Sequence, residues 1–566
     1  MGEPLGCLCL VLHGHLPYVL HHGTYPHGEA WLYEAAAETY LPVLEMIGEV
    51  VAHKARPGLT IGLTPVLLEQ LSHEHFKAGF VAYLDERADR ARQDRKEFAL
   101  RRDGHFEQLA ERWEKWYAGK QAQFERIKRD IPAEFAAHLR AGHIQVLTSN
   151  ATHAYMPLLL NDQMLRAQMA CGTRTTERHL GTKARGMWLP ECAYRPALDQ
   201  WLPAVLYSDP RRRGGVEHFV AEAGVDHFFV DSHTVAGAQP LGTWEGGRFN
   251  EVGDAQVHWD TRRGWRDPLQ PVGVRSDPGP PRCFAMPRHP RVSEQIWSGA
   301  IGYPGAGQYL AFHRKHGERG LRYHKVTDPK VPQSDKHPYQ PDDVFAKLYE
   351  HSQHFCNVVR NALRDFKART GRPGVCVAPF DAELFGHWWF EGPQFLRDVV
   401  FTLSRDPDVK LLTAEEAIAQ FPPDKVVRLP EGSWGEKGNH SVWINDRTRW
   451  IWEMEYRAEG RMLQLLHALP WRQDGRLREV LERAGRELFL LQASDWPFVI
   501  HSQGAVDYGI MRFGGHYTRF DRMANIAHGL ASGDRGRELT AIERVQIEEA
   551  DLHDGVFPEI DLNWWM

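Results

Sequence analysis

The sequence predicts an α/β protein: a β/α barrel of seven strand–helix units with a helical insertion, followed by an all-helical C-terminal domain. Three observations lead to this prediction. Seven short apolar runs are separated by stretches long enough for helices, a pattern typical of buried parallel strands. Several runs end in polar side chains, as barrel strands do at their carboxyl-terminal rim. The length of 566 residues allows one large barrel with additions.

The apolar runs are the predicted barrel strands. They are CLCLVLHGH (7–15), LTIGLTPVLL (59–68), IQVLTSNATH (144–153), ARGMWLPE (184–191), VDHFFVDSH (225–233), GVCVAPFDAE (374–383) and VKLLTAEEA (409–417). The polar side chains at their ends include His13, His15, Glu191, Asp231 and Asp381. Because parallel barrel strands end at one rim, we expect these side chains to lie near one another.

The remaining segments define the predicted domains. Residues 73–142 have helical spacing and faces of mixed charge, which indicates a helical insertion in the barrel. Residues 232–293 lose periodicity and gain Gly, Pro and Arg, which predicts a long irregular, lid-like loop. The barrel is expected over 1–421, and a helical domain that contributes to the substrate cleft over 422–566.

Composition and charge limit the classes of binding partner that we expect. With 42% hydrophobic and 25% charged residues the chain has the balance of a globular protein. A formal charge of -6 favours neither nucleic acid nor an anionic membrane as partner. Each of the 19 Trp is by default a core residue, but together they indicate flat apolar faces suited to sugar rings.

The cysteines and the N-terminal run predict a cytoplasmic protein. The seven Cys are scattered and odd in number, and several lie in strand-like runs, so we expect reduced thiols. The apolar stretch LGCLCLVL is neither preceded by a basic region nor long enough to span a bilayer.

Glu191 and Asp381 form the candidate catalytic pair. Both end apolar strands, 190 residues apart in sequence, so a barrel would bring them to the same rim. Two carboxylates at one rim can cleave a glycosidic bond, one attacking the anomeric carbon or activating water and the other protonating the leaving oxygen. The competing interpretation, that each acid caps a helix, is about as probable from these residues alone.

The His13-x-His15 pair has two interpretations. It could ligate zinc, as in metal-dependent hydrolases of barrel fold, or hydrogen-bond sugar hydroxyls and hold a carboxylate in place. His153, His233 and His387 follow strand-like runs, but none forms a tight second ligand motif. The sequence therefore favours a substrate-binding role, and no metal ligand is assigned.

Five ordered motifs carry a family resemblance. LHGHLPY, GLTPVL, WLPECAY, FDAELFGHWWFEGP and SWGEKGNHSVW together resemble the motifs of glycoside hydrolase family 57. The stretches GEAWLYEAAAETYLPVL, WSGAIGYPGAGQYLAFHRKHG, GLRYHKVTD and SDWPFVIHSQGAVDYGIMRFGGH are similar to the 1,4-α-glucan branching enzymes of that family rather than to its amylases or pullulanases.

The resemblance implies a retaining mechanism on a (β/α)7 barrel. Glu191 matches the family's nucleophile and Asp381 its general acid/base. The implied reaction cleaves an α-1,4-glucan and transfers the segment to a 6-hydroxyl, giving an α-1,6 branch as in glycogen biosynthesis. The implied partner is an α-glucan polysaccharide, and no cofactor is implied.

The resemblance also assigns a substrate cleft. Trp297, Trp434 and Trp443 match the tryptophans that line the family's substrate site, and Asp495 and Trp496 are expected to complete the cleft from the helical domain. Such aromatic platforms would bind the acceptor chain and exclude water, which transfer requires.

One departure from the family concerns the cleft. Its branching enzymes carry a tyrosine on a mobile loop over the cleft, in the region corresponding to 234–290, but this chain has no Tyr between Tyr207 and Tyr303. The aromatic residues available to replace it are Trp244, Phe249, Trp259 and Trp265. Without a replacement, hydrolysis would compete with branching.

Four functions therefore stand beside one another. The first is a branching enzyme. The second is an α-glucan hydrolase (amylase) or 4-α-glucanotransferase of the same family. The third is a zinc-dependent amidohydrolase or deacetylase that uses the His-x-His pair, and the fourth is a glycan-binding protein without activity.

Overall fold

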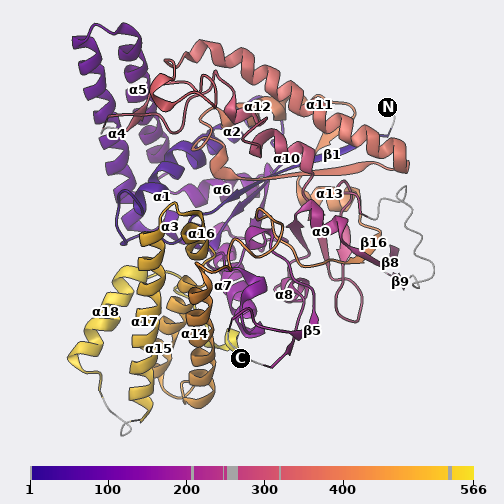
Figure 1. The fold of residues 1–566 in the computed structure, drawn as a ribbon, viewed down its shortest axis with the longest axis vertical. Helices are drawn as coiled ribbons and strands as arrows, with labels where there is room; N and C mark the ends of the chain where they lie inside the picture. The colour runs from indigo at the N-terminus through magenta and orange to yellow at the C-terminus, as the bar shows by residue number, and fades with distance from the viewer. Residues whose placement is uncertain (1–2, 206–208, 246–247, 252–265, 318–319, 533–537) are drawn as a thin grey trace.

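Seven parallel strands form a closed barrel in the computed structural model, which describes residues 3–205, 209–245, 248–251, 266–317, 320–532 and 538–566 (Figure 1). The strands pair in the order β14–β1–β2–β3–β4–β7–β11. Their bounds are β1 Gly6–Gly14, β2 Leu59–Leu63, β3 Ile144–Thr148, β4 Gly186–Met187, β7 His227–Val230, β11 Cys283–Pro287 and β14 Gly374–Asp381. A parallel bridge between Arg288 and Val377 joins β11 to β14 and closes the ring. The predicted α/β barrel of seven strands is confirmed.

The barrel strands are buried over nearly their whole length. Every residue of β1, β2 and β3 is buried, which explains why they appear in the sequence as continuous apolar runs. Strands β1 and β14 start so close together that a Cβ on Gly6 would lie 2.0 Å from the carbonyl oxygen of Gly374. With φ at +150°, Gly6 also has a backbone conformation that favours glycine.

One of the seven predicted barrel strands is wrong. The run 409–417 contains β15 (Val409–Leu411), which pairs with β1 but stands outside the ring. The true seventh member is β11, which lies within the segment 232–293. Its five residues follow a stretch rich in Pro and Gly, so the run is too short to be recognised by periodicity.

The described part of 232–293 is regular structure rather than the irregular loop expected there. It contains β11 together with α9 Ser232–Ala236, β8 Gln239–Glu245, β9 Arg248–Glu251 and β10 Val272–Val274. With β16 (Lys425–Arg428) these strands extend the barrel sheet in the order β11–β10–β16–β8–β9. Residues 252–265 lie outside the described residues. Three- to seven-residue strands that pair with a distant segment leave little local signal in a sequence.

The other elements before residue 422 surround the barrel. The helices are α1 Glu29–Ala35, α2 Leu41–Ala52, α3 Pro65–Ser72, α4 Glu74–Leu100, α5 Gly104–Arg126, α6 Ile131–Arg140, α7 Asp162–Leu180, α8 Val216–Glu222, α10 Pro290–Trp297, α11 Val344–Thr370, α12 Gly392–Leu403 and α13 Ala414–Gln420. The short strands β5 Leu198–Trp201, β6 Arg211–Arg213, β12 Lys315–His316 and β13 Leu321–Arg322 form two small hairpins. Helices α4 and α5, within the predicted insertion, form a long antiparallel hairpin that projects from the barrel (Figure 1).

In the described residues after the barrel, five α-helices pack against one side of it (Figure 1). They are α14 Arg449–Ala468, α15 Gly475–Leu491, α16 Asp495–Ser502, α17 Val506–Ser532 and α18 Ala541–Asp554. Two buried contacts join them to the chain that follows β1. Arg512 donates to the carbonyl oxygen of Tyr18, and His22 Nε2 lies 2.8 Å from Asp554 Oδ1. Among the described residues, no helix is long and apolar enough to cross a membrane.

Candidate active site

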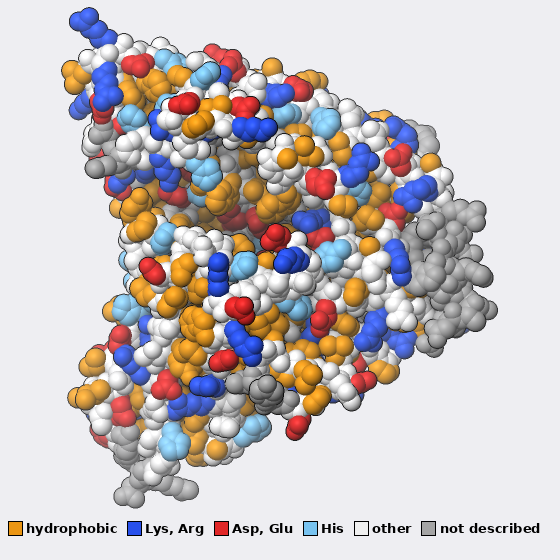
Figure 2. Space-filling view, viewed as in Figure 1, with side chains coloured by type: hydrophobic (Ala, Val, Ile, Leu, Met, Phe, Trp, Pro, Cys, Tyr) orange, Lys and Arg blue, Asp and Glu red, His pale blue; other side chains and the backbone are white. Residues whose placement is uncertain are grey.

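A cleft of about 860 Å³ lies at the carboxyl-terminal rim of the barrel and contains both predicted carboxylates. Figure 2 shows a hollow in this face of the molecule, with acidic side chains in its depth and hydrophobic ones around it. Residues of the barrel and of α16 line the cleft. They are His13, His15, Leu16, Pro17, Tyr25, Pro26, Ala30, Trp31, Glu34, Ala35, His153, Glu191, Arg288, Trp297, Phe312, Lys315, Asp381, Glu383, His387, Trp388, Trp434, Asp495, Phe498 and Val499.

Glu191 sits in a single turn, Pro190–Cys192, shortly after β4. Its φ of +61° and that of Cys192, +48°, lie in the left-handed region, which non-glycine residues adopt at a cost. The carboxylate has fixed partners: the indole N–H of Trp434 donates to Oε2 at 2.7 Å, and the hydroxyl of Ser494 donates to Oε1 at 3.3 Å. The strained turn and these donors aim the Glu191 carboxylate into the cleft.

Burial raises the pKa of Glu191 to about 7. The hydrogen bond from Trp434 lowers the Glu191 pKa, and the charge of Asp495 raises it. The charge of His15 and the hydrogen bond from Ser494 are smaller effects that lower this pKa. Near neutral pH Glu191 is therefore present in both forms, protonated and ionised. The donors around it favour the carboxylate, which is the form that can attack a carbon atom.

Asp381 is the last residue of β14 and lies opposite His13 of β1 in the sheet register. Burial raises the pKa of Asp381 well above its usual value, and the charges of Glu383 and Glu191 add to this effect. Arg288, which forms an ion pair with Asp231, lowers the Asp381 pKa. This environment favours the protonated carboxyl group, which is the form that can donate a proton to a leaving oxygen.

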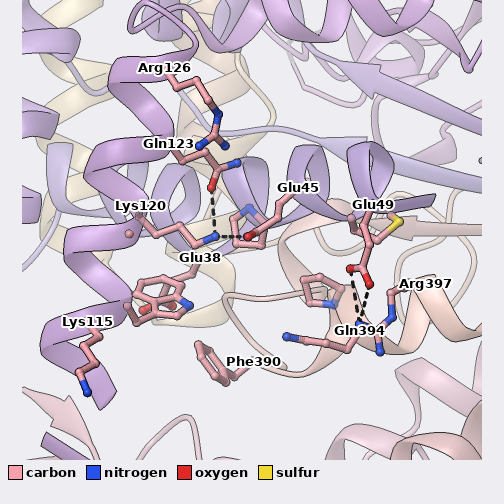
Figure 3. A pocket seen from close by; sticks show the side chains of 15 residues that line it. Glu38, Glu45, Glu49, Lys115, Lys120, Gln123, Arg126, Phe390, Gln394 and Arg397 are labelled. Atoms are coloured by element: carbon pink, nitrogen blue, oxygen red, sulfur yellow. Dashed lines mark hydrogen bonds and ion pairs between the residues drawn. The ribbon is translucent and has the colours of Figure 1, made fainter. Parts of the chain in front are cut away.

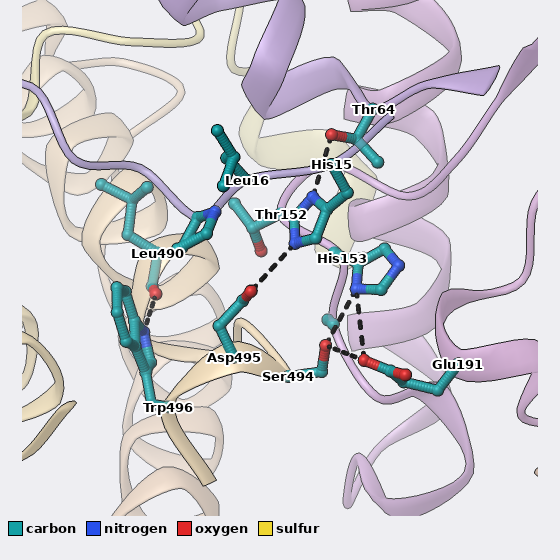
Figure 4. A network of polar contacts seen from close by, with 12 residues as sticks. His15, Leu16, Thr64, Thr152, His153, Glu191, Leu490, Ser494, Asp495 and Trp496 are labelled. Atoms are coloured by element: carbon teal, nitrogen blue, oxygen red, sulfur yellow. Dashed lines mark hydrogen bonds and ion pairs between the residues drawn. The ribbon is translucent and has the colours of Figure 1, made fainter. Parts of the chain in front are cut away.

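Three histidines, His13, His15 and His153, line the cleft together with the two carboxylates. Figure 4 shows His15 and His153 beside Glu191. His13 Nε2 and His153 Nε2 are 3.1 Å apart. His15 Nδ1 lies 3.0 Å from Thr64 Oγ1, and its Nε2 lies 3.0 Å from a carboxylate oxygen of Asp495. Burial holds the pKa of His13 and of His153 well below the usual value. For His15 burial is the largest effect and acts in the same direction, but the charge of Asp495, the hydrogen bond with it and the charges of Glu191 and Glu383 together outweigh burial, so the His15 pKa is raised.

His15, His153 and Asp495 also meet the geometric condition for holding a cation, since one donor atom of each lies within 4.8 Å of the others. In this structure those atoms have hydrogen-bond partners: His15 Nε2 contacts Asp495, and His153 Nδ1 lies 2.9 Å from Ser494 Oγ. These contacts orient His15 beside Glu191. The substrate-binding role of the His-x-His pair stays a prediction.

Of the predicted cleft tryptophans, Trp297 and Trp434 line the cleft. Their ring centroids are 5.9 Å apart at an interplanar angle of 74°, and Trp434 also packs on buried Trp188 at 5.0 Å. The two indoles form an aromatic corner directly beside Glu191.

Trp443 and Trp496 do not line the cleft, which corrects the expectation that they contact substrate. Trp443 is 1% exposed and stacks on Tyr155 at 4.3 Å. Trp496 is equally buried, and its indole N–H donates to the carbonyl oxygen of Leu490 at 2.9 Å. Asp495, by contrast, reaches the cleft. Adjacent residues of a helix point in different directions, so position in a motif does not decide which one reaches a ligand.

Sequence reasoning missed three residues of the site: Glu383 and Arg288, which line the cleft, and Ser494, which is buried beside it. Glu383 accepts hydrogen bonds from the hydroxyl of Tyr40 and from the backbone N–H of His15 at 3.1 Å, and Ser494 contacts both His153 and Glu191. Arg288 follows β11, the strand that periodicity did not reveal. Glu383 and Ser494 lie within two residues of Asp381 and Asp495 in the sequence. This proximity to recognised residues was the one feature of the sequence that could have indicated them.

Of the four aromatic residues suggested as replacements for the loop tyrosine, the two that the structure describes lie away from the cleft. Trp244 and Phe249 pair across the β8–β9 hairpin, and the Arg275 guanidinium lies 4.6 Å from the centre of the Phe249 ring. Neither lines the cleft. Trp259 and Trp265 fall outside the described residues.

Exposed aromatic side chains line the cleft from other segments. Tyr25 is 85% exposed, Trp388 50% and Phe498 45%. Trp388 packs against Phe312 with ring centroids 4.4 Å apart and an interplanar angle of 33°. The cleft therefore offers apolar faces in addition to the corner formed by Trp297 and Trp434.

Comparison with known proteins gives consistent matches over the chain. The family model described as glycosyl hydrolase family 57 matches residues 9–430, and the model described as 1,4-alpha-glucan branching enzyme, C-terminal, matches residues 455–565. The 1,4-alpha-glucan branching enzyme of Thermococcus kodakarensis is 36% identical over 522 residues, 92% of this chain and 73% of that protein.

Two solved structures are also similar over nearly the whole chain. The crystal structure of a GH57-type branching enzyme from Pyrococcus horikoshii has a TM-score of 0.88 at 33% identity, covering 99% of this chain and 97% of that one. The alpha-amylase AmyC from Thermotoga maritima has a TM-score of 0.80 at 28% identity, covering 99% of both chains.

Proposed function

The chain belongs to glycosyl hydrolase family 57, and from this premise we propose that it is a 1,4-α-glucan branching enzyme. The observation that carries the proposal is the placement of Glu191 and Asp381 in one aromatic-lined cleft, where burial raises the pKa of both carboxyl groups. The similarity to branching enzymes at both ends of the chain supports transfer to a glucan as the reaction.

In the first step Asp381 donates its proton to the glycosidic oxygen while a carboxylate oxygen of Glu191 attacks the anomeric carbon. The glycosidic C–O bond breaks, the reducing-end segment leaves as an alcohol, and a covalent glycosyl ester forms on Glu191. The hydrogen bonds from Trp434 and Ser494 hold the attacking carboxylate in position. His15, positioned by Asp495, places positive charge near it.

In the second step the ionised Asp381 removes a proton from the 6-hydroxyl of another glucan chain. The hydroxyl oxygen attacks the anomeric carbon, the ester bond to Glu191 breaks, and an α-1,6 linkage forms with retained configuration. The product is a branched, glycogen-like α-glucan. The apolar faces of Trp297, Trp434 and Trp388 would hold glucosyl rings and displace water, which competes with the acceptor.

An α-amylase activity is the second candidate. It is favoured by the similarity to the Thermotoga maritima alpha-amylase and by the lack of a Tyr between Tyr207 and Tyr303. In that case water, rather than a 6-hydroxyl, would attack the glycosyl ester on Glu191.

Amylose separates the two candidates. We expect wild-type protein to introduce α-1,6 linkages, measured by proton NMR of the anomeric region and by debranching, with little rise in reducing ends. Glu191→Gln and Asp381→Asn should each abolish this reaction, since each removes one half of the double displacement. A rise in reducing ends without α-1,6 linkages would replace the branching proposal with the hydrolase.

The seven cysteines are buried free thiols. Reduced thiols are typical of proteins that work in the cytoplasm, where we place this reaction.

A further inference from the structure

A second pocket, of about 380 Å³, lies outside the catalytic cleft (Figure 3). It is formed where α2, α5 and the start of α12 meet. Its lining residues come from these three helices and from the segments that precede α2 and α12. They are Glu38, Pro42, Glu45, Met46, Glu49, Lys115, Trp116, Gly119, Lys120, Gln123, Arg126, Phe390, Pro393, Gln394 and Arg397. We call it the α2–α5 pocket.

The polar groups of the α2–α5 pocket are held in place by one another (Figure 3). Lys120 forms an ion pair with Glu45, and its Nζ donates to Gln123 Oε1 at 3.1 Å. Gln123 in turn donates to the carbonyl oxygen of Leu41 at 2.7 Å. On the other side, Arg397 Nη1 lies 3.3 Å from Glu49 Oε1. These contacts fix donors and acceptors before any ligand arrives.

Aromatic rings form the apolar part of the same pocket. Trp116 and Phe390 are both half-buried, with ring centroids 5.7 Å apart at an interplanar angle of 54°. Trp116 packs edge-on against Tyr117, and the Nζ of Lys120 lies 5.5 Å from the centre of the Trp116 ring. A partly exposed indole bordered by charged hydrogen-bonding groups offers an apolar face and polar edges, as a pyranose ring requires.

We propose that the α2–α5 pocket is a second glucan-binding site, which holds one or two glucosyl units of a chain away from the catalytic carboxylates. This inference rests on the proposed function, because it takes an α-glucan as the substrate. An uncharged ligand fits better than an anion, since Lys120 and Arg397 already face Glu45 and Glu49. The size of the pocket suits a short saccharide rather than a protein segment.

The α2–α5 pocket is connected to the catalytic cleft through the segment 387–390. His387 and Trp388 line the cleft, whereas Phe390 lines the pocket. Glu38 lines the pocket, and its Oε2 lies 3.1 Å from His387 Nδ1. A polymer bound at the pocket would therefore be retained next to the cleft, which raises the effective concentration of its other chains there.

Filling the pocket tests the proposal. Gly119 lines it, and a Cβ at this position meets no atom within 4 Å, so Gly119→Trp should be tolerated and should occlude the sugar. Trp116→Ala removes the indole instead. Both are made in the Glu191→Gln background, and migration through native gels that contain glycogen is compared with that of the Glu191→Gln parent. We expect each to weaken retention about three- to tenfold, the value of one aromatic stacking contact.

Two matched control variants test whether adding or removing an indole outside the pocket changes glycogen binding. Gly460→Trp places the same side chain on another helix, α14, where the Cβ also meets nothing within 4 Å. Trp450→Ala removes a half-buried indole of α14 that lines neither pocket. Both should migrate as the Glu191→Gln parent does, and thermal unfolding checks that all variants are folded.

Crystals of the Glu191→Gln protein soaked in maltotriose give a direct second readout. Sugar density against Trp116 that disappears in Gly119→Trp supports the proposal. Sugar in the catalytic cleft alone, or equal retention of Gly119→Trp and its parent by glycogen, overturns it. If amylose gains no α-1,6 linkages but these binding differences persist, the branching proposal fails and the second site stands. A parent that glycogen does not retain contradicts the second site.

Discussion

Glu191 is strained in its backbone and costly to ionise in its buried position. Its left-handed φ and its pKa of about 7 both reflect a position that suits chemistry rather than stability. The hydrogen bond from the indole of Trp434 partly offsets the cost of the buried charge. A sequence shows that an acid ends an apolar run, but the donor to it lies 243 residues away.

Replacing Trp434 by Phe tests that role. In the wild type kcat/KM should rise as Glu191 ionises, through a pH near 7. Removing the donor destabilises the carboxylate and raises the Glu191 pKa, so this acid limb should move upward by about one to two pH units. The measurement is the pH profile of kcat/KM for branching. The control is Trp297→Phe, which alters the same aromatic corner but removes no hydrogen bond to Glu191, so its acid limb should stay at the wild-type pH. If the acid limb of Trp434→Phe also stays there, Trp434 does not stabilise the Glu191 carboxylate.

At the scale of elements, helix α16 completes a site that the barrel strands begin. Asp495 is its first residue and holds His15, while Ser494, just before it, bridges His153 and Glu191 (Figure 4). The two proposed catalytic carboxylates come from the barrel, and part of the side chains that hold the site together come from α16 and the residue before it. The short strand β11 contributes in the same way, because it delivers Arg288 to the cleft.

The Asp495→Asn variant tests whether Asp495 positions His15 or binds substrate directly. The amide keeps the shape but removes the charge that raises the pKa of His15, so the His15 pKa falls and a positive charge beside Glu191 is less favoured. We expect kcat to fall by about a hundredfold with KM for amylose nearly unchanged. The acid limb of the pH profile should move little, because the charge of Asp495 raises the Glu191 pKa and the charge of His15 lowers it, and the substitution weakens both. The fall in kcat without a rise in KM is the change that a purely structural defect would not produce.

The matched control is Asp507→Asn, an acid in the first turn of the neighbouring helix α17 that does not line the cleft. It should behave as the wild type. If Asp495→Asn raised KM and left kcat intact, Asp495 would be a substrate ligand rather than a positioning residue.

At the scale of the whole molecule, the barrel and the C-terminal helices depend on each other. Arg512 is buried on α17, donates to the carbonyl oxygen of Tyr18 and to the hydroxyl of Tyr508 at 3.2 Å, and lies 5.0 Å from the centre of the Trp496 ring. Trp496 therefore supports the helix that carries Asp495, although it does not contact the cleft.

Arg512→Met should destabilise the protein by about 3 to 5 kcal/mol, because it leaves buried polar partners uncompensated. Since α16 supplies catalytic positioning, branching activity should be lost in the same thermal transition as helical circular dichroism. Arg461→Met is the control: it breaks a more exposed ion pair with Asp521 inside the helical region and should cost less than about 1 kcal/mol. Activity that outlasts the unfolding of Arg512→Met would show that the barrel works alone.

The sequence by itself determined the barrel, the two carboxylates and the His-x-His pair. Buried parallel strands leave continuous apolar runs, and catalytic side chains follow directly after them. These are local signals, so Glu191, Asp381, His13 and His15 could be found without coordinates. The helical periodicity of the C-terminal segment was equally local.

Only the tertiary structure decided which residues face the cleft. Trp434 and Trp443 occur in one motif, yet one lines the cleft and the other stacks in the core on Tyr155. The strand β11 became visible only through its pairing with β7, and the α2–α5 pocket only through three helices that meet. Side-chain direction, short-strand pairing and cavities depend on contacts between residues distant in sequence, and a local pattern carries no information about them.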